Sequence, residues 1–222
     1  MEIQYLGHSC FKLKGKKATV VIDPYHKESV GFELPKVKAE IVLSSHDHDD
    51  HNNIVAIKGT AKREEPFVIR EPGEYEVEGV SIFGYQTYHD KSEGKERGEN
   101  VVFRLQIDGV NIVHLGDLGH MLTKKMIESF GNVDVLMMPV GGVYTLNAEE
   151  AWKLANEIGA EIIIPMHYRT EKHNPQIFGQ LATLDEFLKV YGGEVKRVEG
   201  KLSISPLNLS GEGREVVVFE AW

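Results

Sequence analysis

LSSHDHDDHNN, residues 43–53, holds three histidines and three aspartates in its six central positions. Neutral imidazole and carboxylate groups are ligands that zinc and manganese accept, and a metal site needs several of them aimed at one point. A solvated turn is more often built from Asn, Gly, Ser and Asp than from histidines at this spacing. The six central residues of the stretch, 46–51, directly follow an apolar run, residues 40–45, that is typical of a buried strand. The stretch therefore predicts half of a metal site at the end of a strand.

Chain length and cysteine content narrow the class of protein. With 222 residues, 41% of them hydrophobic, the chain is long enough to bury a core, and we expect residues 1–222 to form a single domain. The single cysteine, Cys10, cannot form an internal disulfide, and we expect a buried thiol and a reducing cytoplasm. No apolar run approaches the roughly 20 residues of a membrane helix, and no signal-peptide pattern opens the sequence, so we expect neither export nor membrane insertion.

The charge balance bears on the partners. The formal net charge is -9, and the sequence pI is about 5.6. Phosphate backbones usually attract faces rich in Lys and Arg, so nucleic acid is not expected as a partner and a small-molecule substrate is favoured. Bound metal ions would offset part of the negative charge inside the site, so the balance does not give the charge of a small substrate. The oligomeric state stays open.

Residue patterns predict strands first, and then alternating strands and helices. The Asp108-Gly109 pair is typical of a tight hairpin turn, and Asn147 with Glu150 three residues later is typical of a helix start. This order predicts an α/β domain with layered sheets and helices outside. The expected elements are strands at 3–7, 10–14, 18–22, 40–45, several within 66–89, 101–107, 110–116, 133–140 and 161–167, two final strands, helices within 52–58, 121–130, 148–159 and 184–192, and loops at 25–39 and 90–100, the latter mobile.

Further ligand-type residues also follow apolar runs directly. His89 ends TYH, Asp117 follows HLG, and His167 follows IIIPM. Each one alone is more typical of a hydrogen-bonded histidine or a capping aspartate. Together with residues 46–51 they predict that several strand ends meet at one metal centre.

Five motifs in this order resemble the metallo-β-lactamase superfamily over nearly the whole chain. They are IDP at 22–24, SSHDHDDH at 44–51, TYH at 87–89, HLGDLGH at 114–120 and IPMHY at 164–168. The resemblance implies a four-layer αββα sandwich with mixed β-sheets and helices outside. LGHSCF, DPY, GDLGH, PVGG and IPMHY are further similar to small members related to the L-ascorbate-6-phosphate lactonases.

This resemblance implies a dinuclear metal centre. The ligands it implies are His46, His48 and His89 for the first ion, Asp50, His51 and His167 for the second, and Asp117 for both. A hydroxide shared by the two ions would attack an ester, lactone or amide-like bond, with Asp50 and Asp117 as catalytic residues and Asp50 orienting the hydroxide. Histidine-rich ligation favours zinc, with manganese and iron as alternatives. Asp23 is expected to hold the ligand loop by hydrogen bonds.

The other histidines are weaker candidates for a place in the metal site. His8 and His120 lie beside the motifs and are expected either to line the site or to be hydrogen-bonded structural histidines. His114 alternates within a strand and is expected in the core or on the sheet. His26 and His173 fall in loops, and we expect them to be exposed to solvent.

Three loops are candidates for substrate selection. Tyr144 follows Gly141-Gly142 at the end of a strand, where α/β sites usually gather, and Tyr168 opens the loop after His167. Residues 90–100 and 168–182 each follow an expected ligand directly. The alternative is that these loops are only solvated turns.

Two other function classes remain open. A phosphodiesterase or nuclease would share the ligands but would usually add a basic surface or a clamping domain. A non-catalytic metal-binding protein would be expected to lack some of the ligands. The sequence does not determine the natural substrate, the physiological metal or the proton donor to the leaving group, because one scaffold hosts many reactions.

Overall fold

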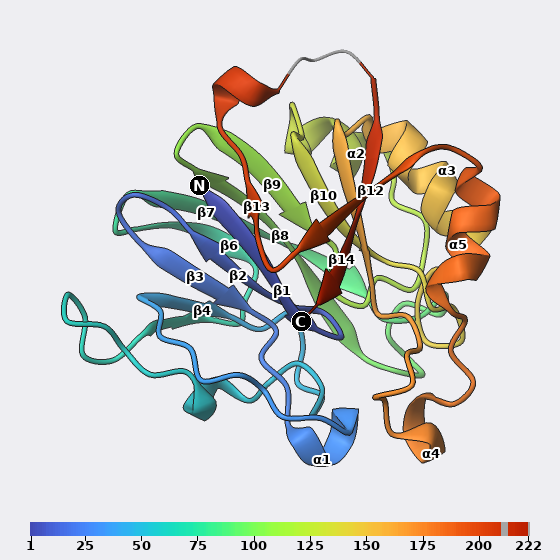
Figure 1. The fold of residues 1–222 in the computed structure, drawn as a ribbon, viewed down its shortest axis with the longest axis horizontal. Helices are drawn as coiled ribbons and strands as arrows, with labels where there is room; N and C mark the ends of the chain where they lie inside the picture. Colours follow the sequence, from blue (N-terminus) through green and yellow to red (C-terminus); the bar gives the residue numbers. More distant parts are fainter. Residues whose placement is uncertain (210–212, 222) are drawn as a thin grey trace.

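Two mixed β-sheets form the centre of the molecule, seen in the computed structural model that describes residues 1–209 and 213–221 (Figure 1). The smaller sheet has the strand order β13 (Leu202–Ser203), β1 (Glu2–Gly7), β2 (Cys10–Lys14), β3 (Thr19–Ile22), β4 (Ile41–Leu43) and β5 (Phe67–Ile69). The larger sheet has the order β12 (Val195–Glu199), β14 (Glu215–Ala221), β11 (Ile162–Met166), β10 (Val135–Pro139), β9 (Val110–His114), β8 (Glu99–Ile107), β7 (Val80–Tyr88) and β6 (Gly73–Val77).

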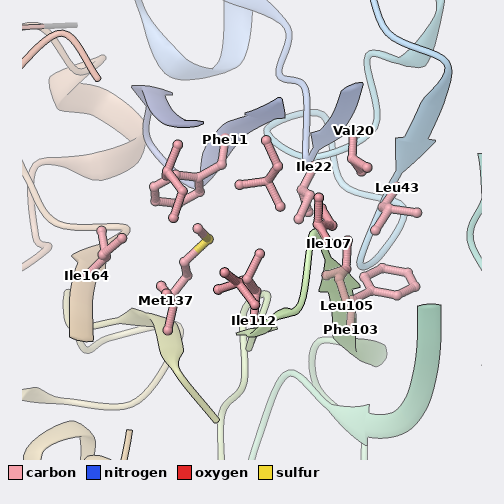
Figure 2. Close-up of a cluster of buried hydrophobic side chains, with 14 of the residues drawn as sticks. Phe11, Val20, Ile22, Leu43, Phe103, Leu105, Ile107, Ile112, Met137 and Ile164 are labelled. Atoms are coloured by element: carbon pink, nitrogen blue, oxygen red, sulfur yellow. The ribbon is translucent and has the colours of Figure 1, made fainter. Parts of the chain in front are cut away.

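The main core lies between the two sheets. Phe11 of β2 and Leu43 of β4 are fully buried, as are Phe103 of β8 and Met137 of β10. Figure 2 shows side chains of the smaller sheet facing those of the larger one across this layer. Because side chains alternate along a strand, each inner face is apolar while the opposite face meets the outer layers.

Helices cover the outer face of the larger sheet. They are α2 (Lys124–Phe130), α3 (Ala148–Ile158) and α5 (Leu184–Tyr191), and a second apolar cluster joins Leu154 of α3 and Phe187 of α5 to Leu136 of β10. The capping box of Asn147 and Glu150 confirms the predicted start of α3.

The outer layer on the smaller sheet is thin. It consists of loops and the short helices α1 (Lys27–Val30), η1 (Ile54–Ala56) and α4 (Pro175–Phe178), and its cluster contains Tyr25, Val42 and Phe178. The expected αββα sandwich is confirmed. Among the described residues, no helix combines the length and the apolar character that crossing a membrane requires.

Five local predictions can be compared with the structure. Three strands rather than two close the chain, because the short β13 returns to pair with β1 of the smaller sheet. Residues 25–39, predicted as loop, contain α1, and the helix predicted within 52–58 is the single turn η1. The Asp108-Gly109 turn is confirmed, with positive φ at both residues. The expected domain range also includes residues 210–212 and 222, which lie outside the described ranges.

The sheet topology brings the ligand-bearing segments together. β7 and β9 both pair antiparallel with β8, while β10 runs parallel to β9 and β11, so β7, β9 and β11 point the same way. Their carboxyl ends therefore meet at one edge of the larger sheet, and His89, Asp117 and His167 follow them. The residues after β4 reach the same edge from the smaller sheet.

Candidate metal centre

The predicted ligands form overlapping clusters. Within each cluster the potential ligand atoms lie within 4.8 Å of one another. The clusters are His46, His48 and His89; His8, Asp50, His51 and His167; and His46, His51 and Asp117. Two clusters of potential ligands thus lie side by side, and the third cluster shares His46 with one and His51 with the other.

Asp117 lies where the two clusters meet. Its Oδ2 atom is 3.1 Å from His167 Nε2, 3.2 Å from His89 Nε2 and 3.3 Å from His51 Nε2. His46 Nε2 is 4.0 Å away on the side of the first cluster. One buried carboxylate oxygen therefore faces imidazoles from both clusters.

Unpartnered polar atoms provide a test of whether this donor set fits a metal. Across residues 1–209 and 213–221, the buried side-chain atoms without a hydrogen-bond partner include His46 Nε2, His51 Nε2 and Asp117 Oδ1. Leaving such atoms buried and unpaired is unfavourable by about 1–3 kcal/mol each. Imidazole nitrogen and carboxylate oxygen are the donors that divalent transition metals prefer, so the set fits a metal centre.

Asp23 sets the direction of two candidate ligand histidines. It accepts the Ser45 N–H through Oδ1 at 2.7 Å and the Ser45 hydroxyl through Oδ2 at 2.7 Å. Since the hydroxyl proton is used there, His46 Nδ1 at 3.0 Å donates to Ser45 Oγ. His51 Nδ1 likewise donates to Asp23 Oδ2 at 2.9 Å. Both rings are therefore held at Nδ1 and direct Nε2 toward Asp117.

Asp50 faces the second cluster. Its Oδ2 lies 3.4 Å from His51 Nε2, 4.0 Å from His167 Nε2 and 3.0 Å from His8 Nε2. Burial opposes its ionisation, but the neighbouring His51 and His8 bring the pKa of Asp50 well below its usual value. The side chain is 13% exposed, so the carboxylate lies at the border between the buried ligands and solvent.

The surroundings of Asp117 favour its ionised form, and those of His46 favour a neutral ring. Burial would raise the pKa of Asp117, but His167 and His51 hold it well below its usual range. Burial, together with the neighbouring His51, lowers the pKa of His46 well below its usual value. A neutral imidazole beside an ionised carboxylate is the protonation state that metal ligation requires.

Three site residues adopt a left-handed backbone. φ is 56° at His8, 50° at Asp23 and 54° at His167. Residues other than glycine rarely adopt positive φ, and such strain persists where surrounding contacts fix the conformation. At each of these positions the chain turns sharply after a strand, which brings the side chain to the shared edge.

The sequence of the chain matches a known family. A model of the beta-lactamase superfamily domain matches residues 2–167. The chain belongs to the metallo-β-lactamase superfamily.

Three proteins similar to this metallo-β-lactamase superfamily member are described as hydrolases. A UPF0173 metal-dependent hydrolase of Methanoculleus marisnigri is 35% identical over 188 residues, which are 77% of this chain and 82% of the relative. A solved superfamily structure from Thermotoga maritima is 37% identical, with a TM-score of 0.79 and coverage of 100% and 99% of the two chains. Igni18, a metallo hydrolase of Ignicoccus hospitalis, is 20% identical with a TM-score of 0.66 over 92% of this chain and 99% of its own, and shares the fold. The protein is a metal-dependent hydrolase of this superfamily.

Residues outside the ligand set fall into different environments. His120 Nε2 accepts the Tyr88 N–H at 3.2 Å, and His120 Nδ1 donates to the Met121 carbonyl at 2.9 Å. Both ring nitrogens are thus used, and His120 ties the end of β7 to the segment after Asp117. His114 is fully buried and hydrogen-bonded to the Ser9 carbonyl at 3.0 Å, as expected for a core histidine.

Three side chains differ from expectation. His173, predicted to be exposed, is only 5% exposed because its ring packs between Phe32 and Phe178 and meets His8. His26 is half-buried. Tyr168, predicted in the substrate loop, is 5% exposed and belongs to the apolar cluster under α3 and α5. A phenol in that cluster contributes to packing, and we assign Tyr168 no contact with substrate.

Tyr144 connects the two loops that follow His89 and His167. Its ring lies under the guanidinium of Arg97, 4.3 Å from the ring centroid, and its hydroxyl donates to the Ile177 carbonyl at 3.1 Å. Residues 90–100 are themselves organised by Asp90, whose carboxylate accepts four backbone N–H groups. The loops expected to select the substrate are thus joined through one half-buried tyrosine.

Asn100 was missed from the sequence. Its side-chain oxygen accepts the Asp117 N–H at 2.9 Å, and its amide donates to Thr87 Oγ1 at 2.8 Å and to the Leu115 carbonyl at 3.0 Å. Asn100 therefore fixes the backbone that carries Asp117. Its position at the end of a polar stretch gave no signal of this role, because the contact depends on the pairing of β7, β8 and β9.

A surface cavity of about 410 Å³ borders His46 and His48. Arg70, Arg97 and Gln86 line this cavity. Its acidic lining residues are Asp47, Glu71 and Glu99. The cavity is within the size range of small-molecule sites and opens beside the first ligand cluster.

Proposed function

We propose that the protein is a two-metal hydrolase that cleaves an ester, lactone or amide-like bond in a small molecule. The observation that supports this most is Asp117 Oδ2, which lies 3.1–3.3 Å from histidine nitrogens of both ligand clusters. A carboxylate in this position suits a bridge between two cations.

The ions would be held by the seven expected ligands, and we propose zinc, with manganese and iron as alternatives. When bound, two such ions lower the pKa of a water molecule and polarise the scissile carbonyl or phosphoryl group. A Thermotoga maritima relative described as a candidate zinc-dependent hydrolase supports the choice of zinc. The buried thiol of Cys10 agrees with the proposed cytoplasmic location.

The chain's own carboxylates orient the reaction. We assign Asp50 to hold the attacking water and to take its proton, since its carboxylate lies between the ligand histidines and solvent. The water oxygen adds to the carbonyl carbon, the bond to the leaving oxygen or nitrogen breaks, and the proton passes to that leaving atom. Asn100 holds the backbone of Asp117, and the Asp117 carboxylate would keep the two ligand clusters at a fixed distance from each other.

Two features support a small substrate. The cavity beside His46 and His48 matches a small molecule in volume, and the net charge of -9 disfavours nucleic acid. The preference for a lactone rests only on the resemblance of the motifs to ascorbate-phosphate lactonases.

A substrate panel tests this proposal. Zinc- and manganese-loaded protein should be assayed with lactones, thioesters, β-lactams and bis-p-nitrophenyl phosphate, before and after removal of the metal by a chelator. We expect chelator-sensitive turnover of carbonyl substrates. No turnover of any carbonyl substrate by protein that holds its metals would contradict the proposal.

The strongest alternative is a phosphodiesterase. Arg70 and Arg97 at the cavity would suit a phosphate group, and this observation keeps the alternative in the panel. Turnover confined to bis-p-nitrophenyl phosphate would favour it. A non-catalytic role would instead give metal binding without turnover of any substrate.

A further inference from the structure

His173 occupies a buried position in the loop after His167. Its Nδ1 atom lies 3.1 Å from the Thr170 backbone nitrogen and 2.9 Å from Thr170 Oγ1. The other ring nitrogen, Nε2, lies 3.1 Å from His8 Nδ1. His8 is fully buried, and its Nε2 lies 3.0 Å from Asp50 Oδ2. A continuous row of hydrogen bonds thus runs from a loop backbone to a site carboxylate.

The first member of this row fixes the direction of all the others. A backbone N–H can only donate, so His173 Nδ1 must accept the bond from Thr170. A neutral imidazole that accepts at one nitrogen carries its proton on the other, so His173 Nε2 donates to His8 Nδ1. By the same rule His8 carries its proton on Nε2 and donates it to Asp50 Oδ2.

The backbone of His8 is held independently. Its carbonyl accepts the His167 N–H at 2.9 Å and the Tyr5 hydroxyl at 2.6 Å. Its left-handed φ of 56° orients the ring toward Asp50 and His167. These contacts fix the backbone of His8, and the hydrogen bond from His173 then sets the tautomer of its ring.

We propose that His173 is a positioning residue that acts through His8 to orient Asp50. Because His8 Nε2 holds a proton, His8 is a donor to Asp50 and not a further protein ligand at the second cluster, although it lies within ligand distance there. The row also links the loop of residues 168–182 to Asp50. The effect on turnover rests on the proposed function. The tautomers of His8 and His173 follow from the hydrogen bonds alone and do not rest on it.

Nuclear magnetic resonance of ¹⁵N-histidine protein tests the tautomers directly. In zinc-loaded wild type we expect His8 and His173 to be protonated at Nε2 and unprotonated at Nδ1, with His173→Phe and His8→Gln variants used to assign the signals. In His173→Phe, which lacks the donor, His8 should lose this single tautomer. A His8 ring protonated at Nδ1 in the wild type would overturn the proposal.

Kinetics of three variants test the consequence. His173→Phe should lower kcat by about 10–100-fold, as loss of an orienting partner commonly does, with KM little changed. His173→Gln offers an acceptor for Thr170 and a donor for His8, and should retain most of kcat. Equal kcat in His173→Phe and wild type, or equal losses in the Gln and Phe variants, would contradict the proposal.

Controls separate this role from general stability and from the proposed function. Thr170→Ala keeps the backbone N–H, and His26→Gln changes a half-buried loop histidine, so both should keep the wild-type His8 tautomer. If the tautomers are as expected but no substrate is hydrolysed, the proposed function fails and the hydrogen-bonded row stands. If turnover occurs with the other tautomer, the row fails and the function stands.

Discussion

At the scale of single residues, Asp117 is the group on which the proposed metal centre depends most. A fully buried carboxylate would be strongly unfavourable without compensation, and here four histidine nitrogens lie within 4.0 Å of one of its oxygens. Four histidines around one carboxylate are an arrangement expected for metal ligation, and not one needed to stabilise the fold. Replacing this group should therefore affect function more than folding.

Asp117→Asn tests that expectation. The amide keeps the shape of the side chain but removes the negative charge, so we expect turnover to fall by at least about 10²-fold, by analogy with loss of orienting or ligating groups at metal sites. Circular dichroism should remain that of the wild type. Full turnover by a folded, metal-loaded Asp117→Asn protein would remove Asp117 from the bridging role.

Asp23 should act through the ligand histidines. Asp23→Asn weakens the acceptor that fixes the direction of His51 and, through Ser45, of His46, so we expect zinc affinity to fall by about 10–100-fold. A competition titration with a zinc indicator measures this change. Asp49→Asn, a change at an exposed aspartate of the same motif, is the control and should leave affinity unchanged. Equal affinities in Asp23→Asn and wild type would contradict the role.

At the scale of elements, the centre depends on close approach between segments. A Cβ atom at Gly119, after β9, would lie 2.5 Å from the backbone carbonyl of His89, after β7. Backbone atoms cannot tolerate this distance, so one segment would have to move. The glycine is thus required where the segments carrying His89 and Asp117 touch.

Gly119→Ala should consequently displace His89 and weaken metal binding at the first cluster. We expect zinc stoichiometry to fall below that of the wild type while the far-ultraviolet spectrum is retained. Asn147→Ala, which removes the cap of α3 and should reduce the free energy of unfolding by about 1 kcal/mol, controls for stability loss. Normal zinc binding in Gly119→Ala would show that the segments adapt.

The strand ends were predictable from the sequence, while the supporting contacts were not. Residues 46–51, His89, Asp117 and His167 each follow an apolar run, so local pattern located them. Asn100 and His173 act through partners distant in the chain, and His8 and His173 are 165 residues apart. Nothing in their local sequence indicates such contacts, and His173 in a polar loop was predicted to be exposed for that reason.

At the scale of the whole molecule, we expect the fold to persist without the metal centre. The main core between the sheets, with side chains such as Phe11 and Phe103, lies apart from the ligands. The protein stripped of metal should therefore remain folded, unlike small zinc domains. A metal present at a thousandfold excess over its Kd should add about 4 kcal/mol to stability, measurable as a higher Tm. Unfolding on chelation would contradict this.

Acid stability should depend in part on Glu40, which joins β3 to the loop before β5. It accepts the Thr19 N–H at 2.7 Å and the Thr60 hydroxyl. Burial opposes its ionisation, but these bonds lower the pKa of Glu40 below its usual value. Because the pKa of this carboxyl is lower in the folded than in the unfolded protein, its ionised form stabilises the fold at pH values above the unfolded-state pKa. This contribution is lost as the pH falls through the folded-state pKa. In urea titrations, Glu40→Gln should lose less stability than wild type between pH 7 and pH 3.5; equal losses would contradict this role.

The number of ions bound per chain tests the central claim most directly. Purified protein should be stripped, titrated with zinc, freed of excess metal and analysed for zinc and protein. The two ligand clusters joined by Asp117 predict saturation at two ions per chain. Saturation at one ion, or no binding after careful reconstitution, would contradict the two-metal centre.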